Sequence, residues 1–100
     1  MKTTIQEQEN HIMVTLVGEL DTTAAMEMEE VLAPLFDNNG RDVIIDCTHL
    51  EYIASSGLRI LLSLLKQGKA HGNKVVLKNV NDDIREVFRL TGVINIFNFE

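Results

Sequence analysis

A chain of 100 residues, 45% of them hydrophobic, can form one compact domain with its own core and is too short for two, so we expect a single domain over residues 1–100. Its formal net charge of −6 argues against direct binding to nucleic acid or to an anionic membrane, because both depend on Lys and Arg. The N-terminus lacks the apolar core of a signal peptide and no apolar run is long enough to cross a bilayer, so we expect a cytoplasmic protein.

The chain opens with two predicted strands, over residues 4–8 and 11–17, around Glu9-Asn10. In the second strand apolar side chains alternate between the two faces, as in a strand with one side buried. The turn residues Gly18-Glu19-Leu20-Asp21 break this pattern. We therefore expect an opening β-hairpin that ends at Gly18.

A helix follows, for which Asp21 or Thr22 can supply the N-cap. Its predicted apolar face contains Ala25, Met28, Leu32, Leu35 and Phe36. Pro34 interrupts the last turn because proline removes a helical hydrogen bond, and Asn38-Asn39-Gly40 is predicted to end the helix.

A third strand is predicted over residues 42–47, where Val43, Ile44 and Ile45 follow one another without a break. Such a run is typical of a central strand covered on both faces. A short polar loop then leads to a helix from Ser55 to about residue 71, with Gly68 and Gly72 at its fraying end. Its apolar stripe contains Leu58, Leu61, Leu62 and Leu65.

The last part of the chain predicts a strand over residues 74–80, a helix capped by Asn81 and stopped by Gly92, and a short edge strand within residues 94–99. Alternating strands and helices after a hairpin predict an α/β domain in which parallel strands pair and helices pack against the sheet.

Two serines and a glycine stand at the start of the second long helix, as Ser55, Ser56 and Gly57. A helix start has backbone N–H groups without intrahelical partners and carries partial positive charge, so it would stabilise an anion such as a phosphate on either serine. A serine there can equally be an ordinary N-cap. Two serines followed by a glycine are more than one cap requires, because a glycine in the first turn weakens the helix and makes room for another group.

Other chemistry finds little support in the sequence. Asp21, Asp46, His49 and Ser55 supply the residue types of a hydrolase, but no Gly-x-Ser-x-Gly motif is present and His49 lies only six residues before Ser55. The histidines are scattered without metal-ligand spacing, and the single cysteine, Cys47, falls in an apolar strand pattern and is predicted to lie in the core. We expect neither an enzyme nor a metal or cofactor site.

Three short motifs occur in order along the chain: Gly18-Glu19-Leu20-Asp21, then Ser55-Ser56-Gly57-Leu58 after an apolar strand, then Leu90-Thr91-Gly92-Val93. In order and spacing they resemble the STAS domain family, and the serine segment is similar to the phosphoacceptor region of its anti-sigma factor antagonists. The resemblance covers nearly the whole chain. It implies a STAS-like fold, with a mixed, mostly parallel sheet of four to five strands that opens with a hairpin and packs against helices.

The resemblance also implies a function. A STAS antagonist binds an anti-sigma factor when unphosphorylated, which frees a sigma factor, and lets go when a serine is phosphorylated. The acceptor position corresponds to Ser55, with Ser56 as the alternative. The anti-sigma factor is the kinase and supplies ATP, magnesium and the catalytic base. Ala54 stands where many members have Asp, so a STAS subunit that is never phosphorylated, in a lipid-transport or signalling assembly, is the alternative.

The surface predicted to contact this partner surrounds the acceptor serine. Ile60 points away from the apolar stripe of its helix and is predicted to be exposed, one turn after Ser56. The predicted contact residues are Asp21, Ala54, Ser56, Gly57, Arg59 and Ile60.

Overall fold

A computed structural model describes residues 1–36 and 40–100 of the chain. Its strands are β1 (Lys2–Glu7), β2 (His11–Leu20), β3 (Asp42–Ile53), β4 (Val75–Lys78) and β5 (Asn98–Phe99). The helices are α1 (Thr22–Leu32), the short 3-10 helix η1 (Ala33–Leu35), α2 (Ser55–Ala70) and α3 (Asp82–Leu90). The strands form one sheet in the order β1-β2-β3-β4-β5, antiparallel between β1 and β2 and parallel elsewhere. The predicted fold class and opening hairpin are confirmed.

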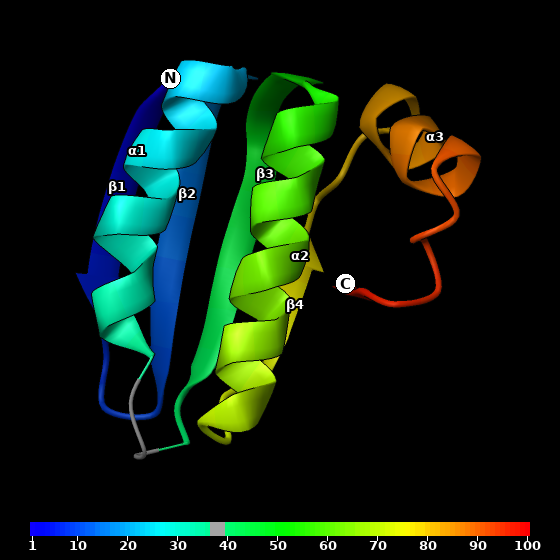
Figure 1. Ribbon diagram of the computed structural model, residues 1–100. Helices are drawn as coiled ribbons and strands as arrows, with labels where there is room; N and C mark the ends of the chain where they lie inside the picture. Colours follow the sequence, from blue (N-terminus) through cyan, green and yellow to red (C-terminus); the bar gives the residue numbers. More distant parts are fainter. Residues whose placement is uncertain (37–39) are drawn as a thin grey trace.

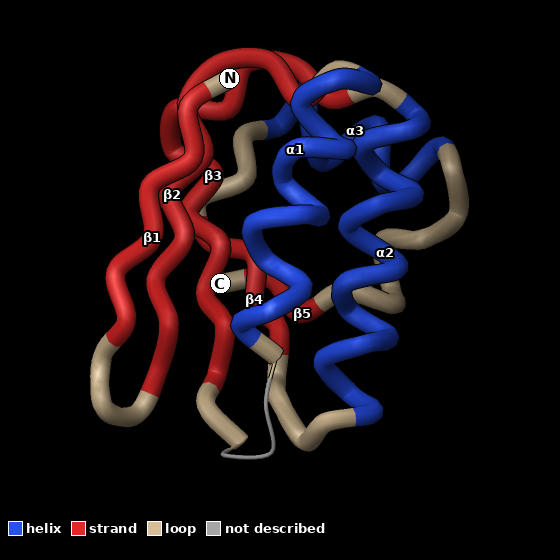
Figure 2. The backbone as a smooth tube through the Cα atoms, turned by 60° about the vertical axis from the view of Figure 1, so that its left-hand side comes forward, coloured by secondary structure: helices blue, strands red, loops and turns tan. Residues whose placement is uncertain are grey.

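The molecule has two layers, with the sheet on one side and the α-helices on the other (Figure 2). Alternate residues of β2 and β3 point into the core between the layers: Ile12, Val14, Leu16, Val43, Ile45 and Cys47. Ile44 is only half-buried. The prediction that this central strand is covered on both faces is therefore wrong, because no helix among the described residues covers the second face. Among the described strands, three consecutive buried residues occur only in the shorter β4, at Val75, Val76 and Leu77.

Strands β2 and β3 are longer than the sequence pattern predicts. The positive φ of Gly18, 107°, and a register shift between Gly18 and Glu19 form an irregularity within β2 where the pattern predicted its end. Beyond it, Leu20 pairs with Ile53, so the predicted polar loop before Ser55 is the second half of β3. The added residues of β2 and β3 supply one another with backbone hydrogen bonds. Neither extension can therefore be recognised from its own stretch of sequence.

The helix caps were predicted more accurately than the strand ends. Asp21 caps α1, accepting a hydrogen bond from the Ala24 N–H at 2.9 Å, and Asn81 caps α3, accepting one from the Ile84 N–H at 2.8 Å. Pro34 lies in η1, so the regular α-helix ends at Leu32, before the proline, and the interruption predicted at Pro34 is confirmed. The predicted helix end at Asn38-Asn39-Gly40 lies largely outside the described residues.

The sequence suggested that Gly68 lies at the fraying end of α2, and this prediction is wrong. Gly68 is buried inside the helix, where an added Cβ would lie 3.0 Å from Val75 Cγ2. The helix ends at Ala70, and Gly72 turns the chain with a φ of +80°. Gly68 is therefore a packing residue that lets α2 lie close to the start of β4.

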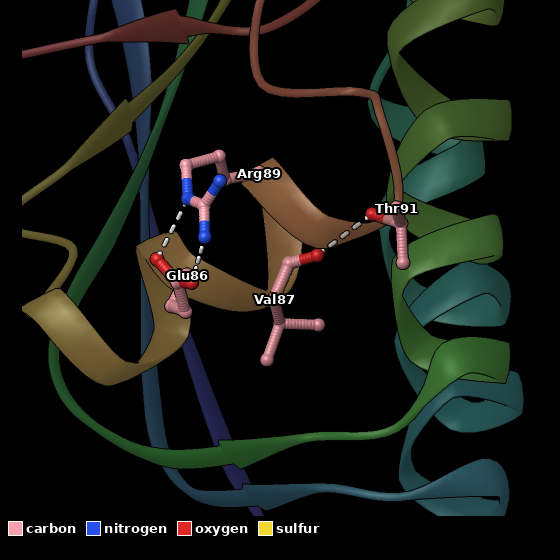
Figure 3. Close-up of polar contacts among 4 residues, drawn as sticks. All are labelled: Glu86, Val87, Arg89 and Thr91. Atoms are coloured by element: carbon pink, nitrogen blue, oxygen red, sulfur yellow. Dashed lines mark hydrogen bonds and ion pairs between the residues drawn. The ribbon is translucent and has the colours of Figure 1, made fainter.

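Helix α3 and the C-terminal segment lie on the β4 and β5 side of the sheet, away from β1 (Figure 1). Arg89 pairs with Glu86 on the surface of α3, and the Thr91 hydroxyl donates to the Val87 carbonyl at 2.8 Å where the helix ends (Figure 3). Phe88 packs edge-on against Phe97, with the ring centroids 5.1 Å apart. The predicted edge strand is confirmed as the two-residue β5.

Candidate functional site

The sequence motifs at residues 18–21 and 55–58 meet at the edge of the sheet where strands β2 and β3 end. Because β2 and β3 run parallel and Leu20 pairs with Ile53, Asp21 and Ala54 leave the sheet side by side and begin α1 and α2 (Figure 1). The Ala54 N–H donates to the Leu20 carbonyl at 2.9 Å, which ties the two helix starts together. The edge where parallel strands end is a common place for functional residues in α/β proteins.

Gly57 is explained by packing within the chain. It is buried, and a Cβ at this position would lie 2.8 Å from both the Cγ atom and the carbonyl oxygen of Leu20. The group for which the glycine makes room is therefore Leu20 of the first motif. This contact fixes the position of the first turn of α2 relative to the end of β2.

The two serines lie in different surroundings. Ser55 is the first residue of α2, it is exposed, and its side chain makes no hydrogen bond within the described residues. Ser56 is half-buried, and its hydroxyl oxygen lies 2.8 Å from that of Thr22 at the start of α1. Sequence reasoning considered Thr22 only as a cap. The pair is 34 positions apart, so only the pairing of β2 with β3 could have indicated it.

Helix α2 lacks the side-chain cap that α1 and α3 have. Ala54 has the extended backbone of an N-cap residue, with φ −80° and ψ 160°, but its methyl group cannot accept a hydrogen bond. The first turn of α2 also contains no acidic residue. The partial positive charge at this helix start is thus without a side-chain acceptor or carboxylate from its own first turn.

The flank of this site differs from the sequence prediction at one residue. Arg59 is exposed, one turn after Ser55. Ile60, predicted to be exposed, is half-buried and packs against the edge of the core. The prediction considered α2 alone, whereas α1 lies beside α2 in the same layer (Figure 1). Asp21 is exposed, with one carboxylate oxygen engaged in capping α1.

Comparison with known proteins identifies the family. The model of the STAS domain matches residues 2–100. This chain belongs to the STAS domain family. BtrV of Bordetella bronchiseptica, provisionally described as an anti-sigma factor antagonist, is 33% identical over 97 residues, which cover 97% of this STAS domain and 84% of BtrV. The anti-sigma-B factor antagonist of Staphylococcus aureus is 29% identical over 91 residues, covering 91% and 84% of the two chains.

Solved structures agree on the fold. The unphosphorylated form of the anti-sigma factor antagonist SpoIIAA has a TM-score of 0.83 at 19% identity and covers 99% of this STAS domain and 88% of its own chain. The phosphorylated form of Bacillus SpoIIAA has a TM-score of 0.76 at 19% identity, covering 99% and 91%.

Asp46, the other acidic residue considered for catalysis, has its own structural partners in this STAS domain. Its Oδ1 atom accepts hydrogen bonds from the Thr48 hydroxyl at 2.6 Å, from the Thr48 N–H at 3.0 Å and from the Asn79 amide at 3.2 Å. These bonds, the one from the Thr48 hydroxyl foremost, lower the pKa of Asp46. Asp46 therefore links β3 to the turn after β4.

Cys47 lies in the core, as predicted, and burial raises the pKa of its thiol to about 12. Residues 1–36 and 40–100 contain no group of three or more His, Cys, Asp or Glu residues placed to hold a metal ion, and they form no pocket. Within the same residues, no helix has the length and apolar character needed to cross a membrane.

Proposed function

We propose that this STAS domain is a cytoplasmic anti-sigma factor antagonist that is switched by phosphorylation of Ser55. Unphosphorylated, it binds an anti-sigma factor with serine kinase activity and so frees a sigma factor. The names of the BtrV and Staphylococcus aureus relatives support the antagonist role. The observation that carries the choice of Ser55 is its exposure at the start of α2, with no side-chain hydrogen bond to any residue of 1–36 and 40–100.

The partner supplies the chemistry in this proposal. The Ser55 hydroxyl oxygen attacks the γ-phosphorus of ATP held by the kinase, the bond from that phosphorus to the bridging oxygen of ADP breaks, and the hydroxyl proton passes to a base of the kinase. This domain is the substrate and a binding module. It needs no cofactor or metal of its own and touches no nucleic acid.

The partner surface is the first turn of α2 with its surroundings. Exposed Asp21 and Arg59 lie on it, with Ala54 and Ser56 half-buried between them. Two further members of the predicted set are less accessible: Ile60 offers a half-buried apolar edge, and Gly57 acts from beneath by fixing the turn against Leu20. Binding would cover the Ser55 hydroxyl and present it to the kinase.

Charge explains how phosphate could end this binding. A phosphoserine adds roughly −1.5 to −2 charge at neutral pH, and a helix start without an acidic residue tolerates that charge locally. A partner surface fitted to a neutral serine would not tolerate the added negative charge. Release therefore occurs by repulsion and steric conflict, with the fold of this domain unchanged.

A second candidate function is a STAS subunit that is never phosphorylated and serves as a scaffold in a lipid-transport or signalling assembly. Ala54 favours this alternative, because the carboxylate that many family members have before the serine is absent. A carboxylate there could orient the hydroxyl or the metal of the kinase.

Phosphopeptide mass spectrometry separates the two functions. The protein is incubated with ATP and the anti-sigma kinase encoded in the same genome, beside Ser55→Ala and Ser56→Ala. Phosphate on Ser55 that disappears only in Ser55→Ala is the expected result. Stable binding of the kinase without phosphate on either serine would contradict the switch and support the scaffold.

A further inference from the structure

The hydrogen bond between Thr22 and Ser56 has no part in the function proposed so far. The two hydroxyl oxygens are 2.8 Å apart and join the first turns of α1 and α2. Either oxygen could be the donor. In one arrangement the Ser56 proton is given to Thr22, and in the other a lone pair of the Ser56 oxygen accepts the Thr22 proton.

We propose that Thr22 is a specificity-determining residue that directs phosphorylation to Ser55 by engaging the hydroxyl of Ser56. This inference rests on the proposed kinase substrate role. Ser55 and Ser56 are the first two residues of α2, and the family resemblance leaves Ser56 as the alternative acceptor. The structure separates them, because Ser56 has a partner and is half-buried while Ser55 is exposed and has none among the described residues.

The bond to Thr22 opposes each step of transfer to Ser56. The Ser56 oxygen must form a bond to the γ-phosphorus of ATP as ADP leaves, and its proton must reach the base of the kinase. Where Ser56 is the donor, Thr22 holds the proton that must leave, and where Ser56 is the acceptor, Thr22 occupies a lone pair of the attacking oxygen. A typical intramolecular hydrogen bond therefore slows transfer to Ser56 by about two- to tenfold, and the start of α1 beside it leaves less room for a phosphate.

The test uses Ser55→Ala as the background, so that only Ser56 remains at the helix start. Phosphorylation of Ser56 by the anti-sigma kinase is timed by mass spectrometry in Ser55→Ala and in Ser55→Ala with Thr22→Val, which keeps the shape of the side chain and removes its hydroxyl. Thr23→Val is the matched control, because Thr23 is the next residue of α1, is exposed, and makes no side-chain hydrogen bond within the described part of the chain.

We expect Thr22→Val to accelerate phosphorylation of Ser56 about two- to tenfold and Thr23→Val to leave it unchanged. With Ser55 present, Thr22→Val should also place a fraction of the phosphate on Ser56. Equal rates with and without Thr22→Val, while Ser55 of the wild type is still phosphorylated, would overturn the role of Thr22 and leave the proposed function standing. Absence of phosphate from every form would contradict both.

A measurement without the kinase tests the bond itself. In a double-mutant cycle of Thr22→Val and Ser56→Ala, urea unfolding should show the two changes to be non-additive by about two- to tenfold in the folding equilibrium constant. Additive effects would show that the hydroxyls do not interact in solution, which would overturn the inference.

Discussion

At the scale of single residues, Ala54 departs from the Asp that the family resemblance implies before the acceptor serine. The position has N-cap geometry without a capping side chain, whereas Asp21 and Asn81 cap the other two α-helices. The substitution that restores the common family residue is therefore also a test of local stability.

Ala54→Asp should raise the free energy of unfolding by about 1 kcal/mol, because an Asp at the N-cap accepts a hydrogen bond from the first turn and complements the helix dipole. Urea denaturation measures the change. Ala70→Asp, at the exposed last residue of α2, is the control and should be neutral or destabilising, since a negative charge is unfavourable at a helix C-terminus. A gain in both variants would indicate a general charge effect and contradict the assignment.

Gly57→Ala tests the contact that holds the two motifs together. Alanine favours a helix over glycine by up to about 1 kcal/mol, but the added Cβ would lie 2.8 Å from the backbone oxygen of Leu20. Overpacking should win, with a net loss of about 1–3 kcal/mol in urea denaturation. Ser55→Ala, at the exposed start of the same helix, is expected to change stability far less, and a stabilised Gly57→Ala would refute the close approach.

The Cys47 thiol should be inert in the folded protein. With its pKa raised to about 12 by burial and its side chain in the core, almost no thiolate forms at pH 8. Alkylation by iodoacetamide, followed by mass spectrometry, should be very slow without denaturant and complete in urea. Rapid labelling of the folded protein would contradict this.

At the scale of elements, local patterns in the sequence identified the helices, the cap Asn81, Asp21 as one of two candidate caps, and the order of strands and helices along the chain, because these depend on neighbouring residues. They missed the second half of β3, since its residues become a strand only by pairing with the end of β2. They also missed the half-buried state of Ile60, because the pattern of α2 alone does not show how its side chain packs against the core.

The pairing of β3 with the turn after β4 has a pH-dependent component through Asp46. Hydrogen bonds, that from the Thr48 hydroxyl first, lower the pKa of Asp46 in the folded protein below its ordinary value of 3.8. A lowered pKa contributes stability above the ordinary value, and this contribution is lost as the pH falls through the lower folded-state pKa.

Asp46→Asn should therefore destabilise the protein at pH 6 more than it does at pH 3. Urea denaturation at both values measures the difference. Asp42→Asn, at the exposed start of the same strand, is the control for a change of charge alone. An equal loss at both pH values in Asp46→Asn would show that the hydrogen bonds do not favour the carboxylate.

At the scale of the whole molecule, the fold brings two motifs more than thirty residues apart to one edge of the sheet. The sequence predicted both motifs and the acceptor Ser55 through the family resemblance. It did not predict that Leu20 fills the space above Gly57 or that Thr22 contacts Ser56, because both contacts arise from the parallel pairing of β2 and β3. The result is a helix start at which Ser55 is exposed and Ser56 is half-buried beside Thr22.

The central claim is that phosphate on Ser55 controls binding without altering the fold. The most direct test is titration calorimetry of the anti-sigma kinase against the unmodified protein and the Ser55-phosphorylated protein, with circular dichroism of both. The account predicts binding at least about 100-fold weaker for the phosphorylated form, as a charge facing an unsuited surface costs several kcal/mol, with unchanged spectra. Equal affinities would contradict the switch, and a collapsed spectrum would contradict release by local repulsion.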